Sequence, residues 1–325
     1  MKRSITLLLA LLFVFSISST ALAEDKLPTV GILQFLQHPA LDAARDGFLK
    51  AFAEEGFVDG ETVKIDYQNG QASQDICASI ADAFIAAPVD LAIAIATPAV
   101  QALAGKTETI PILGTAVTDY VLAKLVDTNE VPKFNVSGTS DMNPVAEQVA
   151  LIKRLVPDAK VMGLLYTSSE VNSQLQAGLA KAEAERLGMQ VVEVTVNNTN
   201  DVQQAAINVL EQCDVLYIPT DNIVASSIAL VVEEALNRKI PIAGSEAAHI
   251  HGGGTFTLGI DYFKLGEQTG RMAARVLRGE AEVSTMPIER QSEFEHLINK
   301  TFMDALGLPI PEELLPFAIE VGEAD

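Results

Sequence analysis

The sequence predicts an α/β protein built from two doubly wound, Rossmann-like lobes with parallel sheets, joined by a hinge that the chain crosses more than once. Short apolar runs alternate with amphipathic stretches at helical spacing along most of the chain, as is typical of parallel sheets covered by helices. The alternation restarts near residue 140. About 300 residues are also too many for one typical core and favour two lobes of roughly 120–150 residues each.

The first half of the chain reads as four strands alternating with three helices. In the first helix Leu41, Ala44 and Phe48 recur at helical spacing, and Gly56 follows as a stop. The segment 89–95 is a nearly continuous apolar run, as expected for a strand buried on both faces. We expect strands at 29–33, 63–67, 89–95 and 110–114, and helices at 38–55, 73–86 and 97–105.

The second half repeats this order after a break in periodicity at 134–141, which reads Phe-Asn-Val-Ser-Gly-Thr-Ser-Asp. The two halves share no detectable sequence repeat, so the repetition is one of architecture. We expect helices at 143–155, 169–187, 199–212 and 222–237, and strands at 160–166, 190–196, 215–218 and 240–243.

The remaining tail is too short for a third domain and must fold back onto both lobes. It contains a flexible glycine stretch at 252–254, a strand at 255–260, a helix at 261–278, extended pieces at 288 and 294–297, and a helix at 299–306. We therefore expect an N-lobe formed by 24–135 with 258–283, and a C-lobe formed by 136–257 with 284–325.

The N-terminus has the features of a cleavable export signal at 1–23. Lys2 and Arg3 precede an apolar run at 5–17, and Ala21-Leu22-Ala23 supplies the small residues of a cleavage site. The apolar run is too short for a stable membrane span. No cysteine stands directly after the cleavage point, which disfavours a lipid anchor. These features predict a protein cleaved after Ala23 that works unanchored in the periplasm.

Composition and motifs exclude several functions. The formal charge of −21 disfavours binding to nucleic acid and to anionic membranes. No phosphate-binding glycine motif is present, and too few histidines surround Glu246 and His249 for a metal site, so we expect neither cofactor nor metal. Cys77 and Cys213 lie far apart in the chain, and we expect them to be unpaired.

The candidate binding residues follow the ends of the predicted strands. In open parallel sheets ligands bind beyond the carboxyl ends of the strands, where helix N-termini offer N–H groups to anions. Hydroxyls and amides dominate these positions in the N-lobe, whereas carboxylates appear in the C-lobe. This asymmetry suits a zwitterion, although any one residue would also fit an ordinary helix cap. The candidates are Gln34, Phe35, His38, Thr97, Thr115, Ala116, Thr118, Tyr166, Asp221, Asn222 and Glu246.

Three segments resemble landmarks of the ABC transporter substrate-binding protein family, and most of all its TrpX-like members, which bind tryptophan and other aromatic amino acids. These segments are 30–42 (VGILQFLQHPALD), 135–141 (NVSGTSD) and 259–266 (GIDYFKLG). The resemblance covers nearly the whole mature chain. It implies a type I periplasmic-binding-protein fold, no enzymatic activity, and delivery of a small amino acid-like solute to an ABC permease by a monomeric receptor.

The resemblance also implies roles for individual residues. Thr97, and Thr115 with Ala116 or Thr118, would hold the carboxylate of the ligand, which we expect to be tryptophan, phenylalanine or tyrosine. Either Glu246 or Asp221 would hold the ammonium group.

Phe35 and Tyr166 could stack on the ligand ring, since the chain has no tryptophan. Two alternatives remain open: a sensor module for a signalling partner, and a hydrolase or isomerase that uses Asp221 and Glu246 as an acid–base pair.

Overall fold

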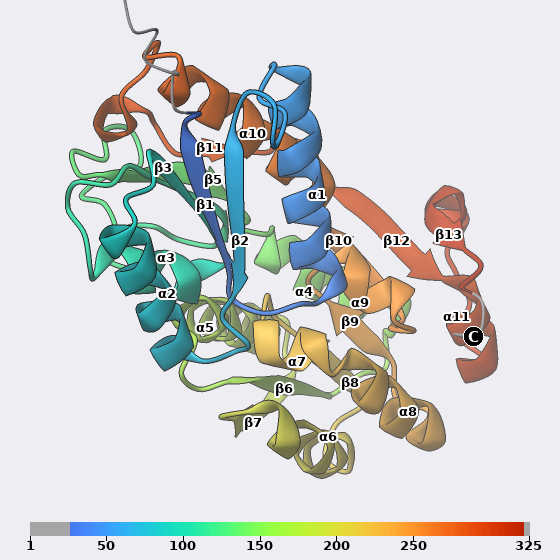
Figure 1. Ribbon diagram of the computed structural model, residues 1–325. Helices are drawn as coiled ribbons and strands as arrows, with labels where there is room; N and C mark the ends of the chain where they lie inside the picture. Colours follow the sequence, from blue (N-terminus) through green and yellow to red (C-terminus); the bar gives the residue numbers. More distant parts are fainter. Residues whose placement is uncertain (1–26, 322–325) are drawn as a thin grey trace, which may run out of the picture.

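The computed structural model describes residues 27–321 and shows two α/β lobes, each built on one sheet (Figure 1). The first sheet has six strands in the order β11-β5-β4-β3-β1-β2, and the second has seven in the order β13-β12-β10-β9-β8-β6-β7. The strand pairs run parallel except for β10 and β12. The predicted fold class of two doubly wound lobes is therefore confirmed.

The N-lobe, built on the first sheet, follows the predicted order closely. Its strands are β1 (Thr29–Gln34), β2 (Lys64–Asn69), β3 (Leu91–Ile95), β4 (Ile112–Val117), β5 (Val136–Ser140) and β11 (Glu289–Arg290), and its helices are α1 (Pro39–Glu54), α2 (Gln74–Ala86), α3 (Thr97–Ala104) and α10 (Tyr262–Leu277). Every residue of β3 and β4 is buried, in agreement with their apolar sequences.

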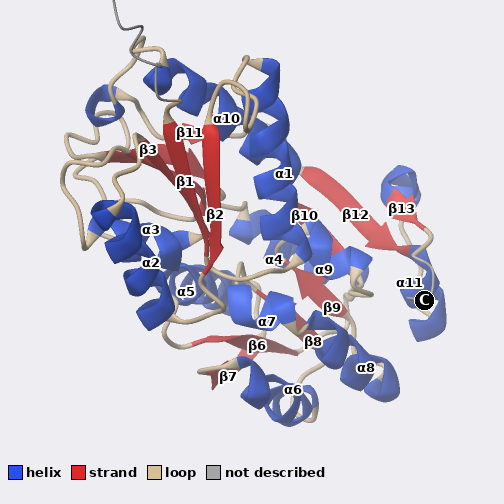
Figure 2. Cartoon of the chain, viewed as in Figure 1, coloured by secondary structure: helices blue, strands red, loops and turns tan. Residues whose placement is uncertain are grey.

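The C-lobe is built on the second sheet. Its strands are β6 (Val161–Thr167), β7 (Gln190–Val196), β8 (Val215–Ile218), β9 (Ile242–Gly244), β10 (Phe256–Gly259), β12 (Glu295–Asn299) and β13 (Ala318–Ile319). Its helices are α4 (Val145–Leu155), α5 (Val171–Arg186), α6 (Val202–Leu210), α7 (Asn222–Ser226), α8 (Ile228–Arg238), α9 (Ala247–His251) and α11 (Lys300–Leu306). Figure 2 shows helices on both sides of the sheet of each lobe.

The chain crosses between the lobes after β5, after β10, and again between β11 and β12. This differs from the division expected from the sequence, which assigned 136–140 and 289–290 to the C-lobe. Both segments pair within the N-lobe sheet. The sequence Val-Ser-Gly-Thr-Ser is polar and therefore predicts a joint between the lobes, but every residue of β5 is buried. Its hydroxyls can be buried because they form hydrogen bonds; Ser137, for example, donates to the Met286 carbonyl at 2.8 Å.

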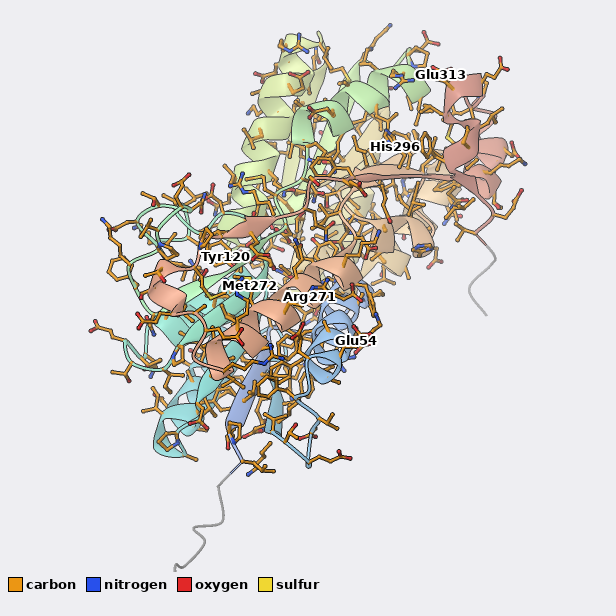
Figure 3. All side chains as sticks on the ribbon, turned by 90° about the horizontal axis from the view of Figure 1, so that it is seen from above. Glu54, Tyr120, Arg271, Met272, His296 and Glu313 are labelled. Atoms are coloured by element: carbon orange, nitrogen blue, oxygen red, sulfur yellow. The ribbon has the colours of Figure 1, made fainter. Side chains whose placement is uncertain are left out.

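Helices α1 and α10 are far apart in sequence but pack side by side in the N-lobe, as the labelled Glu54 and Arg271 show in Figure 3. Their backbones approach closely at two glycines. A Cβ atom at Gly47 would collide with the carbonyl of Phe263, and one at Gly266 would collide with the carbonyl of Ala44. The small residues therefore fix the return of the chain onto the N-lobe after the second crossing.

Two local predictions need correction. The helix expected at 222–237 is broken into α7 and α8 at Ser227, which leaves the helical conformation (φ −120°, ψ 18°). The stretch expected to be flexible at 252–254 instead closes the short helix α9, and it is tightly packed, since a Cβ atom at Gly254 would lie 2.7 Å from the carbonyl oxygen of His249.

The predicted signal at 1–23 lies outside the described residues. Within residues 27–321, no helix combines the length and apolar character needed to cross a bilayer. Cys77 and Cys213 are buried, unpaired thiols in different lobes, as expected.

Candidate functional site

The carboxyl ends of the two parallel sheets meet at the junction of the lobes. His38, which follows β1, and Asn222, which follows β8, join the lobes there, with 3.4 Å between Nε2 and Oδ1. All but one of the predicted binding residues are buried: Gln34, Phe35, His38, Thr97, Thr115, Ala116, Thr118, Asp221, Asn222 and Glu246. Polar groups buried in such number need partners, and atoms of His38, Thr97 and Glu246 have none within residues 27–321.

Two alanines at the ends of N-lobe strands adopt backbone angles that glycine takes more readily. Ala96 has φ 85° and ψ 149°, and Ala116 has φ 57°. Such conformations cost on the order of 1–3 kcal/mol each and cluster at functional sites. At Ala96 the strained angle turns the chain at once from β3 into α3, and its N–H still bonds to the carbonyl of Thr115 at 3.0 Å. The first N–H groups of α3 are thereby held at the lobe junction.

The three candidate threonines differ in whether their hydroxyls are already used. The Thr97 hydroxyl is buried at the start of α3 and has no hydrogen-bond partner among the described residues. The Thr115 hydroxyl instead accepts from Thr139 at 3.1 Å, and the Thr118 hydroxyl donates to Asp141 at 2.8 Å. Thr97 is therefore the one of the three whose hydroxyl makes no hydrogen bond within the described residues.

Three further candidates are engaged by their own lobes to different degrees. The Gln34 amide donates to Asp42 at 2.8 Å, and so serves the interior of the N-lobe. The hydroxyl of Tyr166 donates to Glu193 at 3.0 Å, on the exposed side of the C-lobe. Phe35 is 4% exposed and lies directly after β1.

Of the two candidate acids, Asp221 is fully used within the C-lobe. It caps α7 by accepting from the N–H of Val224 at 2.8 Å, and it accepts from both the N–H (2.5 Å) and the hydroxyl (2.8 Å) of Thr167. These bonds tie the end of β8 to the end of β6. Asp221 therefore acts as the cap that the sequence also allowed.

Glu246, after β9, is in a different situation. It is 1% exposed, and its Oε1 atom has no hydrogen-bond partner within residues 27–321. The Nε2 atom of His249 lies 3.6 Å from Oε1 of Glu246. Burial raises the pKa of Glu246 to about 8, and the carboxyls of Asp141, Asp221 and Glu170 add to the effect. Burial also lowers the pKa of His249 to about 3, so this imidazole brings no charge to the site at neutral pH.

The structure adds a third buried acid, Glu170, which is not among the binding residues predicted from the sequence. Glu170, between β6 and α5, is 3% exposed. Its Oε2 atom accepts from the side chains of Asn172 (3.0 Å) and Asn222 (2.5 Å), while its Oε1 atom has no partner in the described part of the chain. Burial, followed by the charge of Asp221, raises its pKa to about 8. Its position after a strand was the available signal.

Nine of the twelve unpartnered buried polar atoms within residues 27–321 lie in the segments that follow these strands or in the adjoining helices; the other three belong to Asn129, Thr257 and Gln268. The nine are Nδ1 of His38, Oγ1 of Thr97, Oδ1 of Asn143, Oε1 of Glu170, Oδ1 of Asn172, Nε2 of Gln176, Oε1 of Glu246 and both ring nitrogens of His249. Each buried polar atom without a partner costs about 1–3 kcal/mol. A polar ligand that enters the junction would recover part of this free energy.

The crossovers lie directly beside these acids. Tyr262, at the start of α10, donates its hydroxyl to Asp141 at 2.9 Å, and Asp141 follows β5. Two of the interlobe connections are thus joined by one buried hydrogen bond. Glu246 interacts with both residues, since their presence shifts its pKa. A ligand at Glu246 would be close to the hinge.

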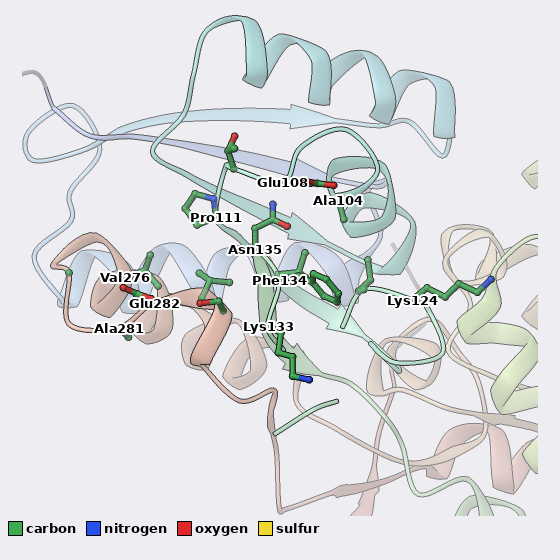
Figure 4. Close-up of a pocket in the computed structure, with 16 residues that line it drawn as sticks. Ala104, Glu108, Pro111, Lys124, Lys133, Phe134, Asn135, Val276, Ala281 and Glu282 are labelled. Carbon is green, nitrogen blue, oxygen red and sulfur yellow. The ribbon is translucent and has the colours of Figure 1, made fainter. Parts of the chain in front are cut away.

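Two cavities lie elsewhere in the molecule. One of about 880 Å³ is at the pole of the N-lobe, between the α3–β4 connection, the start of β5 and the end of α10 (Figure 4). Another, of about 430 Å³, is between α8, α9 and α11. Neither is lined by a predicted binding residue. Among the described side chains no group of three or more His, Cys, Asp or Glu could hold a metal ion.

Known proteins resemble this chain over most of its length. The family model described as ABC transporter substrate binding protein matches residues 29–322. A tyrosine-binding protein of Clostridioides difficile (strain R20291) is 41% identical over 285 residues, which cover 88% of this chain and 82% of the relative. The crystal structure of an ABC domain in complex with L-Trp from Streptococcus pneumonia has a TM-score of 0.87 at 38% identity and covers 90% of this chain and 100% of that one.

Two of the solved structures differ in how closely they superpose on this protein. A ligand-free, open substrate-binding protein with adhesive properties from Clostridium difficile is 42% identical, with 91% of this chain and 100% of that one covered, yet its TM-score is 0.69. This protein thus superposes more closely on the L-Trp complex than on that ligand-free, open structure. The chain belongs to the ABC transporter substrate-binding protein family, whose members are solute-binding proteins and not enzymes, and it has the type I periplasmic-binding-protein fold.

Proposed function

We propose that this protein is the solute receptor of an ABC importer and binds an aromatic amino acid between its two lobes. The proposal rests mainly on the different polar groups that each lobe leaves without a partner among the described residues. In the N-lobe this group is the Thr97 hydroxyl at a helix N-terminus, and in the C-lobe it is the Glu246 carboxyl. An α-amino acid carries the complementary charges. The tyrosine-binding relative and the relative in complex with L-Trp support an aromatic side chain.

The carboxylate of the ligand would bind at the N-terminus of α3. The free N–H groups of the first turn and the positive end of the helix dipole favour an anion there. Thr97 adds a hydroxyl donor, and the strained backbone at Ala96 and Ala116 keeps the N–H groups close to the ligand. Thr115 and Thr118 would support this arrangement from the interior through Thr139 and Asp141 rather than by direct contact.

The ammonium group would bind to Glu246. Among residues 27–321, no lysine or arginine forms an ion pair with Glu246, Glu170 or Asp221. A buried carboxylate without a cation is unfavourable, whereas one paired with an ammonium group gains a charge-assisted hydrogen bond. Asp221 is the weaker candidate because its oxygens already accept three hydrogen bonds.

The ring of the ligand would lie among apolar side chains at the ends of the strands. Phe35 is the aromatic residue of the N-lobe best placed for this, because it is buried directly after β1. His38 and Asn222 would close the site over the ring, and Tyr166 would stay at the rim.

Export and docking complete the proposal. We expect cleavage after Ala23, release of a monomer into the periplasm, and docking of the two lobes onto a permease in the inner membrane. Peptide mass mapping of the exported protein should find Glu24 at the N-terminus, and a retained leader would exclude the free periplasmic form.

The experiment that tests the proposal is thermal unfolding of the purified protein with each of the twenty amino acids. A ligand at one hundred times its Kd stabilises the folded state by about 2.7 kcal/mol, so an aromatic amino acid should raise the Tm by several degrees. Glu246→Ala should abolish this rise, whereas Glu185→Ala, an exposed glutamate on α5, should leave it unchanged. A protein that responds to none of the twenty would exclude an amino acid receptor.

A further inference from the structure

We propose that Glu170, together with Asn172 and Asn143, selects aromatic amino acids whose ring carries a hydrogen-bond donor, so that tyrosine and tryptophan bind in preference to phenylalanine. This inference rests on the proposed function, because it concerns the side-chain end of the same site. It assigns a specificity role to an acid that neither the sequence motifs nor the relatives' names single out.

The Glu170 carboxylate is held rigidly by one of its oxygens. Oε2 accepts from the Asn172 side chain at 3.0 Å, from the Asn222 side chain at 2.5 Å and from the Asn222 backbone N–H at 3.3 Å. Oε1 is buried and has no partner among the described residues. Because three donors fix Oε2, Oε1 is presented in one direction. A ligand donor at Oε1 favours the ionised form over the neutral acid of pKa about 8, and the ionised Oε1 accepts that hydrogen bond without rearrangement.

Two amide oxygens beside Glu170 are in the same condition. The Asn172 amide donates to the carbonyl of Thr220 at 3.0 Å, and the Asn143 amide donates to the hydroxyl of Thr220, also at 3.0 Å. These bonds set the orientation of each amide, and Oδ1 of both residues remains without a partner in residues 27–321. One group connected through Thr220 therefore presents three unpartnered acceptors beside one unpartnered donor, Nε2 of Gln176, whose Oε1 accepts from the Thr220 N–H at 2.9 Å. A ligand satisfies the acceptors only if it brings O–H or N–H donors to this end of the site.

The sheet order separates this acceptor group from Glu246. Glu246 follows β9 and Glu170 follows β6, and β8 lies between these two strands. Strands are spaced at about 4.8 Å, so the two acids are on the order of 10 Å apart along the edge of the sheet. A separation of this size matches an aromatic amino acid that extends from its ammonium group at Glu246 to the far edge of its ring at Glu170.

The ring chemistry then decides affinity. The hydroxyl of tyrosine and the indole N–H of tryptophan can both donate to Oε1 of Glu170. Phenylalanine would fill the same volume and leave the acceptors buried and unpaired. A site built to bond a ligand donor discriminates strongly against the analogue that lacks it, by a factor of 10⁴–10⁵ in the best cases.

Isothermal titration calorimetry with L-tyrosine, L-tryptophan and L-phenylalanine tests the inference. The wild-type protein should bind tyrosine and tryptophan at least about 100-fold more tightly than phenylalanine. Glu170→Gln should turn its amide NH₂ toward the ligand, because the asparagine donors keep the remaining oxygen. Tryptophan, which can only donate, should then lose more affinity than tyrosine, whose hydroxyl can also accept, and phenylalanine should be little affected.

Three comparisons separate the possible failures. Glu246→Gln should weaken all three ligands alike, and Glu185→Gln, on the exposed face of α5, should change none of them. Equal wild-type affinities for the three ligands, or an equal loss for all three in Glu170→Gln, would overturn the role of Glu170 while the amino acid receptor stands. No binding of any of them by the wild-type protein would overturn both.

The ligand side provides a test that does not depend on a folded variant. O-methyltyrosine and 1-methyltryptophan keep the ring but lose the donor, and both should bind the wild-type protein at least about 100-fold more weakly than their parents. Affinities equal to those of the parent amino acids would contradict the inference.

Discussion

Replacing Glu246 with glutamine should stabilise the ligand-free protein at alkaline pH while it destroys the binding site. The pKa of Glu246 is raised from 4.5 to about 8, first by burial and then by the neighbouring carboxyls. Each pH unit by which a pKa moves corresponds to about 1.4 kcal/mol, so ionising this buried carboxyl costs on the order of 4–5 kcal/mol once the pH is well above 8. A neutral glutamine of the same size avoids that cost.

The sign of the effect follows from the raised pKa. The stabilising contribution of a carboxyl whose pKa is raised in the folded state is complete below pH 4.5 and is lost as the pH rises through 8. The Tm of the wild-type protein should therefore fall faster than that of Glu246→Gln between pH 6 and pH 9. At about 2 °C per kcal/mol for a chain of this size, the difference at pH 9 should be several degrees.

The assay is circular dichroism melting of both ligand-free proteins over this pH range. Glu267→Gln is the matched control, because Glu267 is partly buried, bonds to Lys50 at 2.6 Å and has a lowered pKa. It should lower the Tm across the whole range. Wild-type and Glu246→Gln curves that stay parallel from pH 6 to pH 9 would refute the buried, unpaired state of Glu246.

Three further predictions concern the same site. Binding of an aromatic amino acid at pH 7 should release protons, and the affinity should rise between pH 6 and pH 8, because the ligand ammonium group favours the ionised form of Glu246. Titration calorimetry in two buffers of different ionisation enthalpy measures the proton release, and a binding enthalpy that is the same in both buffers would contradict it. Thr97→Val should weaken ligand binding about tenfold, whereas Thr97→Ser, which keeps the hydroxyl, should bind like the wild-type protein. Equilibrium dialysis measures both affinities, and equal affinities of the two variants would show that the hydroxyl does not contact the ligand. Ala96→Gly should raise the free energy of unfolding by about 1 kcal/mol in urea titrations, because glycine adopts φ 85° without strain. An unchanged urea midpoint of unfolding would show that the turn stores no strain.

Much of the fold could be predicted because its dominant signals are local. The buried strands β3 and β4 and the amphipathic helix α1 are visible as apolar runs and as helical spacing. Strand β5 could not be found this way, because its Val-Ser-Gly-Thr-Ser sequence is polar and is buried only through partners distant in sequence, such as Thr269, whose hydroxyl lies 2.9 Å from that of Thr139. Hydropathy does not record partners of this kind.

The site shows the same division between local and distant information. The sequence places Asp221, Glu246 and Glu170 equally well, since each follows a strand. Only tertiary contacts distinguish them, because Asp221 is used by Thr167 and Val224, whereas Glu246 and Glu170 each keep an unpartnered oxygen. The interpretation of strand-end residues as a binding rim is supported by their burial, but the role of each acid depends on which neighbours already bond to it.

A crystal structure of the protein grown with L-tyrosine would test the central proposal most directly. We predict that the amino acid lies between the lobes, with its carboxylate about 2.7–3.2 Å from the first N–H groups of α3 and the Thr97 hydroxyl, and its ammonium group at hydrogen-bond distance from Glu246. An amino acid bound outside the lobe junction, or one whose ammonium group is held by Asp221 while Glu246 makes no contact, would contradict this account of the site.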